Sequence, residues 1–439
     1  MMKDKLDSPS FSQILKNGNL YDFSFFCLLL LICTIPLPNL VNNVIVGILV
    51  LYSFSQLKKR VFYFTKEMIL PIILFVWMTI SCIWSIDFLG SLKALPKESS
   101  LLLLPFAFAL IFYQNKDLLI KFYSSSISLY AIFFLLRSVF RFFTENSTTV
   151  FFGHELVTKE LNAIHFSVFV SIALFYFLTK ANKAIKDYLQ LILLVLFLLL
   201  LNSKSIILTN IILIGLYFFF YSKSANKMRL RNMVLLVSLL LSFVFFNKIR
   251  EKIEFEFQLH KENNIGHTVI PKEVVGEKII SMKEAWENDK FEQSDFFSGA
   301  SFRVYQFRMF LEIMKEENVL FQGLGLNASY KILKEKGMKY NVFRGNGTTE
   351  GYQNKNFHNQ YVQIFAELGL IGFILLVLIL FLNLKNAINN KDFIHIAFAI
   401  LMISLFLTES FLWRQRGVVF FTAFYCLFNI TNNVQIRKN

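Results

Sequence analysis

Long apolar runs alternate with short polar connections along almost the whole chain. Most of the runs have about the 20 residues that a helix needs to cross a bilayer. Within lipid, only structures that satisfy their own backbone hydrogen bonds are stable, so these runs predict helices. The pattern therefore predicts an all-α polytopic membrane protein with about 12 transmembrane helices. The expected spans are 22–38, 40–56, 68–86, 99–114, 118–139, 163–179, 187–202, 205–222, 231–247, 366–384, 393–411 and 417–431.

One polar interruption, between the ninth and tenth predicted spans, is much longer than the others. Residues 248–357 hold 17 basic and 16 acidic residues, a balance typical of a hydrated, folded loop. Helical spacing of apolar residues predicts a helix over Ser301–Glu317, followed by a turn at Gln322–Leu326. We therefore divide the chain into an N-terminal transmembrane bundle, a large, partly helical loop and a C-terminal transmembrane part, at 1–247, 248–357 and 358–439.

Positive charges predict the orientation of these helices. With the N-terminus in the cytoplasm, the cytoplasmic connections hold 19 Lys and Arg residues, and the short external connections hold 7. Because basic residues concentrate on the cytoplasmic side, we expect both termini to be cytoplasmic and the large loop to be periplasmic. The first apolar run follows a short basic segment and lacks a small-residue cleavage pattern, which favours a retained helix. The expected location is the bacterial inner (cytoplasmic) membrane.

Composition supports lipid as the solvent for most of the chain. Apolar residues make up 55% of it, charged residues 17%, and it contains 53 Phe. The net charge of +15 is spread over short clusters between apolar runs, which is typical of topology signals and argues against nucleic acid as a partner. All four cysteines lie in apolar runs, so neither a disulfide framework nor a cysteine zinc site is expected.

Common cofactor and catalytic motifs are missing from the sequence. It contains no GxxxxGK[ST] phosphate loop, no HExxH pattern and no GxSxG elbow. We therefore expect no metal and no cofactor. Five of the six histidines have no partner pattern and are interpreted as structural: His154, His165, His260, His267 and His395.

The candidate chemistry is a cluster of ionisable residues at the external membrane boundary. Each residue alone has an ordinary explanation, because Lys and Arg often anchor helix ends and His often caps them. Together they suit a lipid-linked diphosphate, since cations can stabilise the charge that grows on a diphosphate leaving group. An imidazole, with an ordinary pKa near 6.5, can accept a proton from an attacking hydroxyl. The cluster consists of Lys204, Arg303, Arg308, His358, Glu409, Arg414 and Arg416.

Five segments of the chain together resemble the O-antigen ligase family, which includes related O-antigen polymerases and bacterial O-oligosaccharyltransferases. The segment NSKS is similar to a short Ser-Arg turn of the family, with Lys204 where Arg is usual. HNQYVQIFAELGLIG resembles the family's start of the span that follows the loop. The segments that carry the resemblance are Ser81–Lys97, Asn202–Ser205, Ser301–Tyr330, His358–Gly372 and Thr408–Phe421.

The resemblance implies a metal-independent, inverting glycosyltransferase that uses glycans linked to undecaprenyl diphosphate at the periplasmic face. By position, His358 matches the residue that activates the acceptor hydroxyl, and Arg303 and Lys204 match the groups that bind the diphosphate. Lys204 keeps the charge of the usual Arg but lacks its two-pronged geometry. Gly323 and Gly325 are expected to shape a turn. Three further residues are candidates for substrate contact or support: Arg308, Glu409 and Arg414.

Several functions stay open at this stage. The acceptor is most simply lipid A-core, but a growing glycan chain, as in a polymerase, or a protein hydroxyl, as in an O-oligosaccharyltransferase, uses the same chemistry. A flippase or transporter for lipid-linked oligosaccharides needs polar groups deep within several spans and often repeated helices, which this sequence lacks. A membrane anchor without chemistry needs none of the boundary cluster.

Overall fold

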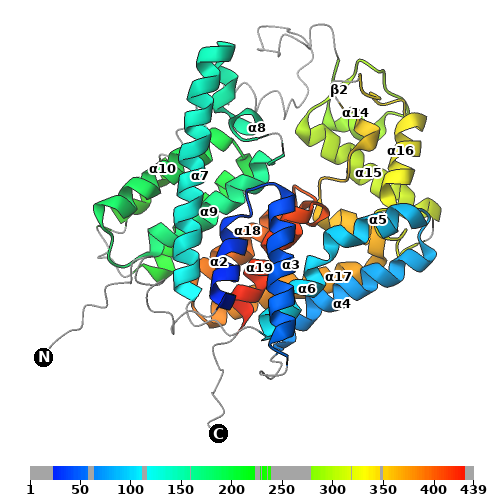
Figure 1. Cartoon of the computed structure of the whole chain (residues 1–439). Helices are drawn as coiled ribbons and strands as arrows, with labels where there is room; N and C mark the ends of the chain where they lie inside the picture. The colour runs from blue at the N-terminus through cyan, green and yellow to red at the C-terminus, as the bar shows by residue number, and fades with distance from the viewer. Residues whose placement is uncertain are drawn as a thin grey trace, which may run out of the picture.

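A computed structural model describes residues 23–57, 64–110, 116–158, 160–222, 228, 230–234, 236–238, 278–317, 319–346 and 350–430. In this part of the chain the regular structure is almost entirely helical (Figure 1). In chain order the main elements are α2 (Phe23–Cys33), α3 (Asn39–Ser55), α4 (Lys66–Ser81), α5 (Phe88–Glu98), α6 (Ser100–Leu110), α7 (Lys116–Glu145), α8 (Gly153–Leu156), α9 (Ala163–Thr179), α10 (Ile185–Leu201), α11 (Lys204–Leu216), β1 (Ile279–Ile280), α14 (Met282–Glu287), β2 (Phe296–Phe297), α15 (Gly299–Glu317), α16 (Ser329–Lys339), α17 (Gln360–Asn389), α18 (Phe393–Phe406) and α19 (Gln415–Asn429).

The apolar helices make the chain a multi-pass membrane protein. Every predicted span apart from 231–247 coincides with a helix, and most of 231–247 lies outside the described residues. Among the described residues, four helical stretches are long and apolar enough to cross a membrane. They are Lys66–Trp84, Lys116–Glu145, Lys204–Tyr221 and Gln360–Asn389. Several shorter apolar helices accompany them, and the total of about 12 spans remains a prediction.

Helix α5 occupies a segment that the sequence analysis treated only as a connection between spans. The side chain of Asp87 accepts a hydrogen bond from the N–H of Gly90 at 3.1 Å and so caps the start of the helix. With 11 residues, α5 is too short to cross a bilayer. It buries Ser91, Ala94 and Glu98 against the protein, and it is the helix that brings Lys97 to the end of the bundle where the large loop lies.

The centre of the bundle is formed by α9 and α19, whose residues are nearly all buried. Small and hydroxyl side chains let neighbouring helices approach these two closely, and a buried hydrogen bond of 2.8 Å joins Asn210 to Ser171. The outer helices expose Phe, Leu and Ile side chains, as on α3, α7 and α17. Lipid is the natural partner of such an apolar exterior.

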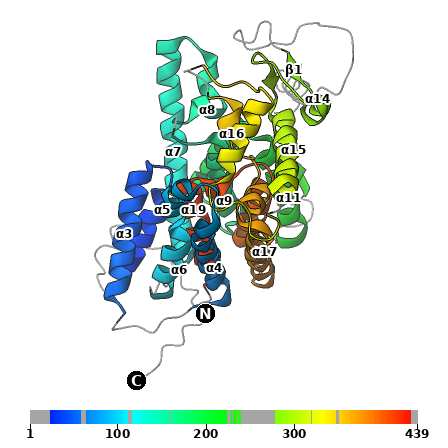
Figure 2. The same cartoon turned by 90° about the vertical axis from the view of Figure 1, so that its right-hand side faces the viewer.

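The described part of the large loop builds a core of its own. Helices α14, α15 and α16 and the two-residue parallel pair β1 and β2 surround it, at the same end of the molecule as α8 (Figures 1 and 2). The predicted helix over Ser301–Glu317 is α15, which begins two residues earlier. Its apolar face packs into this core, with Phe302, Met309 and Ile313 buried. The aromatic ring of Phe310 extends the same face toward α17, through Phe357 and Phe365.

The loop is joined to the bundle at a break in α17. Gly369 has a φ of +66°, which interrupts the helix and frees backbone groups on both sides of it. The turn at 322–326 pairs with them: Leu324 donates to the carbonyl of Ala366 at 2.9 Å, and Gly325 donates to that of Glu367 at 2.8 Å. This turn therefore completes the backbone hydrogen bonding of a broken membrane helix.

Two tryptophans from the start of the chain hold the same junction. The indole N–H of Trp77 donates to the carbonyl of Leu368 at 2.9 Å, and that of Trp84 donates to Gln322 at 3.2 Å. The Ser81 hydroxyl accepts a hydrogen bond from the N–H of Leu326 at 3.1 Å. Three of the segments that carry the family resemblance thus meet here: Ser81–Lys97, Ser301–Tyr330 and His358–Gly372. The first of them lies more than 200 residues before the other two.

Replacing Gly323 with alanine should destabilise the folded protein. Gly323 has a φ of +72°, and an added Cβ would lie 2.3 Å from the carbonyl carbon of Glu367. A left-handed conformation costs a non-glycine residue about 1–2 kcal/mol, and displacement of the α17 backbone adds to this. We expect the midpoint of thermal unfolding in detergent to fall by several degrees. Gly47→Ala is the matched control, since nothing lies within 4 Å of that Cβ; equal midpoints for both variants would contradict the proposed role of the turn.

Candidate functional site

His358 lies in a tight turn immediately before α17. Its φ of +49° is in the left-handed region, and its backbone N–H donates to the Asn356 side chain at 3.0 Å. Asn359 then caps the helix by accepting hydrogen bonds from two N–H groups of the first turn. The imidazole rests with its ring centroid 5.7 Å from that of Phe302 on α15, and its side chain is 29% exposed. The turn thus holds the ring in one place while leaving it accessible.

A buried carboxylate lies between His358 and Arg303. One Glu409 oxygen is 3.7 Å from Nδ1 of His358 and 3.6 Å from Nη2 of Arg303. The Arg303 guanidinium also donates from Nε and Nη2 to the carbonyl of Thr408, at 3.3 and 3.0 Å. Glu409 therefore joins the loop helix α15 to the start of α17, and it orients the imidazole through Nδ1.

Glu409 lies outside the membrane helix that precedes it. The sequence predicted a span as far as residue 411, but α18 ends at Phe406, and the chain then turns. Burial by itself would raise the pKa of the Glu409 carboxyl. The interaction with His358 and the positive charge of Arg303 outweigh it and hold this pKa below its ordinary value. The carboxylate is therefore ionised at neutral pH and can stabilise a protonated imidazole.

Glu409→Gln should lower the rate of glycan transfer and make the melting midpoint less dependent on pH in acid. The amide keeps the size of the side chain but loses the charge that orients His358, so we expect turnover to fall at least about tenfold. A lowered carboxyl pKa stabilises the fold fully above about pH 4.5, and this stabilisation is lost as the pH falls through the lowered value. The wild-type melting midpoint should therefore drop more steeply below about pH 4.5 than that of Glu409→Gln. Exposed Glu335→Gln on α16 is the control, and identical pH slopes for wild type and Glu409→Gln would contradict the assignment.

The start of α11, at Lys204, lies beside the same turn. Lys204 is the first residue of α11, after a left-handed Asn202 that reverses the chain from α10. The hydroxyl of the next residue, Ser205, is 3.4 Å from that of Thr408, and one turn later the hydroxyls of Thr209 and Ser404 are 2.6 Å apart. Contacts at Thr408 therefore place the start of α11 beside the turn that binds Arg303.

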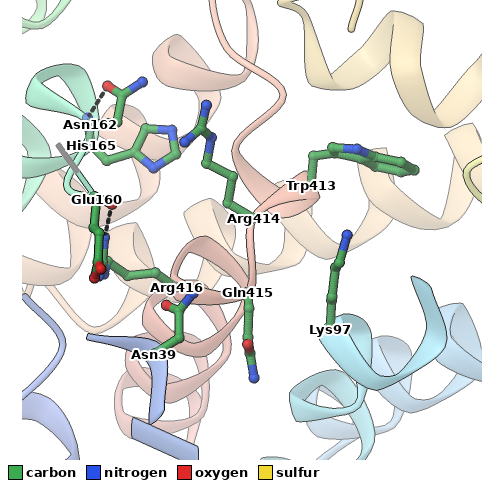
Figure 3. A pocket seen from close by; sticks show the side chains of 9 residues that line it. All are labelled: Asn39, Lys97, Glu160, Asn162, His165, Trp413, Arg414, Gln415 and Arg416. Carbon is green, nitrogen blue, oxygen red and sulfur yellow. Dashed lines mark hydrogen bonds between the residues drawn. The ribbon is translucent and has the colours of Figure 1, made fainter. Parts of the chain in front are cut away.

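Arg308 and Arg414 lie apart from this group. Arg308 belongs to the interior of the loop, where it pairs with Glu312 at 2.9 Å and donates to the carbonyl of Asn288 at 2.7 Å. Arg414 follows the helical turn Phe411–Trp413, and its side chain points into a separate cavity (Figure 3). The structure thus brings together His358, Arg303, Glu409 and the start of α11.

Three polar residues on one face of α17 support the site and were missed in the sequence analysis. Gln360 accepts a hydrogen bond from the N–H of Leu412 at 2.7 Å. Gln363 accepts one from Phe357 at 3.2 Å, and it donates to Glu367 at 2.6 Å. These three residues are spaced by three and four positions in an otherwise apolar span, so they share one helical face. Because buried polar groups in a membrane need partners, this spacing could have indicated a polar site.

Among the described residues, no group of three or more His, Cys, Asp or Glu side chains could hold a metal ion. Arg303 places a guanidinium in the site, and Lys204 begins α11 beside it. Guanidinium and ammonium groups are strong donors to phosphate oxygens. The arrangement pairs these cations with a histidine whose second nitrogen contacts a carboxylate, which is the orientation that general bases commonly use.

A scan against family profiles matches residues 189–377 to O-Antigen ligase. The match covers 189 of the 439 residues, and over that segment the chain is similar to this family. No curated protein matches the chain.

The matched O-antigen ligase segment contains Lys204, Arg303, Gly323, Gly325 and His358, whereas Glu409 and Arg414 lie beyond it. The match supports a glycosyltransferase-type enzyme of O-antigen ligation or polymerisation, with a lipid-linked glycan as substrate and the membrane as its setting. The resemblance seen in the sequence motifs is thereby confirmed at the level of the family.

Proposed function

We propose that this protein transfers a glycan from undecaprenyl diphosphate to a hydroxyl of an acceptor at the periplasmic face of the inner membrane, with lipid A-core as the acceptor. The observation that carries the proposal is the grouping of a histidine, a buried carboxylate and an arginine around the turn at Thr408 and Glu409, with the start of α11 at Lys204 beside it. The excess of basic residues in the opposite connections supports a periplasmic position for this end of the bundle.

In the proposed reaction, His358 accepts the proton of the acceptor hydroxyl. Because Nδ1 contacts Glu409, the nitrogen that meets the hydroxyl is Nε2. The acceptor oxygen forms a bond to the anomeric carbon, and the bond from that carbon to the diphosphate oxygen breaks on the opposite face, so the configuration inverts. Glu409 stabilises the imidazolium that results.

Arg303 and Lys204 bind the diphosphate and stabilise the charge that develops on it as it leaves. Such preorganised cations commonly contribute about 10²–10³ in rate. Arg303 is well suited, because its position is set by the Thr408 carbonyl while its side chain remains 37% exposed. The bond between the glycan and the diphosphate stores the driving force, so the reaction requires no nucleotide.

The function is tested by a deletion strain examined for surface polysaccharide. Loss of a ligase should leave capped polymer on the lipid carrier and bare lipid A-core. Single repeat units attached to the core would identify a polymerase instead. Proteins that lack their usual glycans would identify an O-oligosaccharyltransferase. Unchanged glycans in all three assays would refute the proposal. Complementation with wild type should restore the polysaccharide.

A further inference from the structure

A second polar cavity, of about 230 Å³, lies beside the proposed active site (Figure 3). Its walls come from the end of α5, the connection before α9, the first turn of α9 and the start of α19. The side chains that define it are Lys97, Glu160, His165, Trp413, Arg414 and Arg416. The segment 408–413 separates this cavity from Arg303, since the Thr408 carbonyl binds Arg303 whereas Trp413 lines the cavity.

The cavity carries an excess of positive charge. Three cationic side chains line it against a single carboxylate, that of Glu160. Arg416 is held by backbone carbonyls, those of Glu160 at 2.6 Å and Leu37 at 2.9 Å. Within the described part of the chain, the side chains of Lys97 and Arg414 make no hydrogen bond or ion pair. Two cations are therefore available to a ligand.

Buried polar atoms at the cavity also lack partners. The Nε2 atom of His165, whose side chain is only 2% exposed, has no hydrogen-bond partner, and neither does Nε of Arg416. Figure 3 shows the His165 ring turned toward the Arg414 side chain, with Lys97 approaching from the other side beneath Trp413. An unsatisfied buried polar group is unfavourable, and a ligand oxygen that accepts a hydrogen bond from Nε of Arg416 would remove this penalty.

The N-terminus of helix α19 contributes a positive electrostatic field at the cavity. Its first residues, Gln415 and Arg416, line the cavity, and no side chain caps its N-terminus. The uncapped N–H groups of a helix carry a partial positive charge and attract anions. Cationic side chains, unpartnered buried atoms and a helix terminus therefore all favour the same class of ligand.

We propose that this cavity binds a phosphate group on the sugar acceptor, as a subsite distinct from the donor diphosphate site. The inference rests on the proposed function. A cavity of 230 Å³ is smaller than the roughly 300–1,000 Å³ of sites that enclose a whole small ligand, so it suits one anionic group and part of a sugar ring. Trp413, whose ring is tilted by 33° to that of Tyr330 with centroids 5.8 Å apart, offers an aromatic face for that sugar ring. The ring of His165 packs against that of Phe411, with centroids 4.5 Å apart, and Glu409, two residues earlier in the same segment, contacts His358, which places the cavity next to the proposed base.

The test measures binding without turnover. The full chain in nanodiscs is titrated with a phosphorylated glucosamine-disaccharide glycolipid, with the same lipid after enzymatic dephosphorylation, and with undecaprenyl diphosphate. We expect the double variant Lys97→Gln with Arg414→Gln to bind the phosphorylated glycolipid at least tenfold more weakly than wild type. Its affinity for the other two lipids should be unchanged. Lys93→Gln, an exposed lysine on the same helix but outside the cavity lining, is the matched control and should bind like wild type.

Two results would overturn the subsite. Equal affinities of wild type and double variant for the phosphorylated glycolipid would show that the cavity binds no phosphate. Weaker binding of undecaprenyl diphosphate would assign the cavity to the donor instead. His358→Ala separates this proposal from the proposed function, because it should bind the phosphorylated glycolipid normally while failing in transfer. Normal transfer by His358→Ala would refute the catalytic proposal alone.

Discussion

Glycan transfer by His358→Ala is expected to be about 10²–10⁴-fold slower than by the wild-type protein, the usual contribution of a general base. The imidazole is the exposed proton acceptor that the turn before α17 holds against Glu409. Its removal leaves the acceptor hydroxyl without a base, while the cations that bind the donor stay in place. The measurement is in vitro transfer from an undecaprenyl-diphosphate-linked glycan, with membrane insertion and thermal stability recorded in parallel.

His154→Ala is the control for this substitution. His154 is also an exposed histidine, near the start of α9, but it lies in α8 and makes no described contact with Glu409. We expect it to transfer at the wild-type rate. His358→Gln tests orientation separately, because glutamine retains hydrogen-bonding capacity but is a very poor base. Transfer by His358→Ala within threefold of wild type would remove His358 from the mechanism.

Arg303→Gln should lower transfer by about 10²–10³-fold, the loss typical of removing one donor to a developing negative charge. The variant loses the charge that stabilises the leaving diphosphate and also leaves Glu409 with fewer partners. Arg303→Lys should recover part of the rate, since lysine keeps the charge but not the fork that reaches the Thr408 carbonyl twice. The assay compares the turnover number and the KM for the donor.

The matched control is Arg344→Gln, which removes an exposed arginine of the loop. Arg344→Gln should change neither the turnover number nor the KM for the donor. If Arg303→Gln raises the KM for the acceptor alone, the diphosphate assignment is wrong. A fall in thermal stability without a change in rate would instead limit Arg303 to joining α15 to the bundle through Glu409.

The sequence identified the residues of the candidate site better than their roles. His358, Arg303 and Glu409 were chosen as boundary residues, and they lie together. Arg308 lies on the same helix as Arg303, and the sequence made both of them candidates for the site. In the structure, however, Arg308 lies in the loop interior with Glu312. The difference is one of helical face: positions five residues apart point in different directions on a helix, and only the docking of α15 decides which direction meets the bundle.

Some features followed from the sequence because they depend on local physics. Runs of apolar residues must form helices in lipid, so each predicted span within the described residues is helical, and the apolar face of α15 was visible in its spacing. The resemblance to the O-antigen ligase family was also visible in the sequence, in motifs that carry local turns and helix starts, and the match over residues 189–377 supports it. Such features depend on neighbours within a few residues along the chain.

Only the tertiary structure decided which distant segments meet. The pairing of the turn at 322–326 with the break in α17, the position of Glu409 between Arg303 and His358, and the cavity around His165 all join parts of the chain 40 or more residues apart. His165 had no partner in the sequence because its neighbours at the cavity lie in α5 and at the start of α19. The sequence specifies the chemistry of each side chain. The charges that surround a group depend on three-dimensional packing, and packing depends on the whole chain at once.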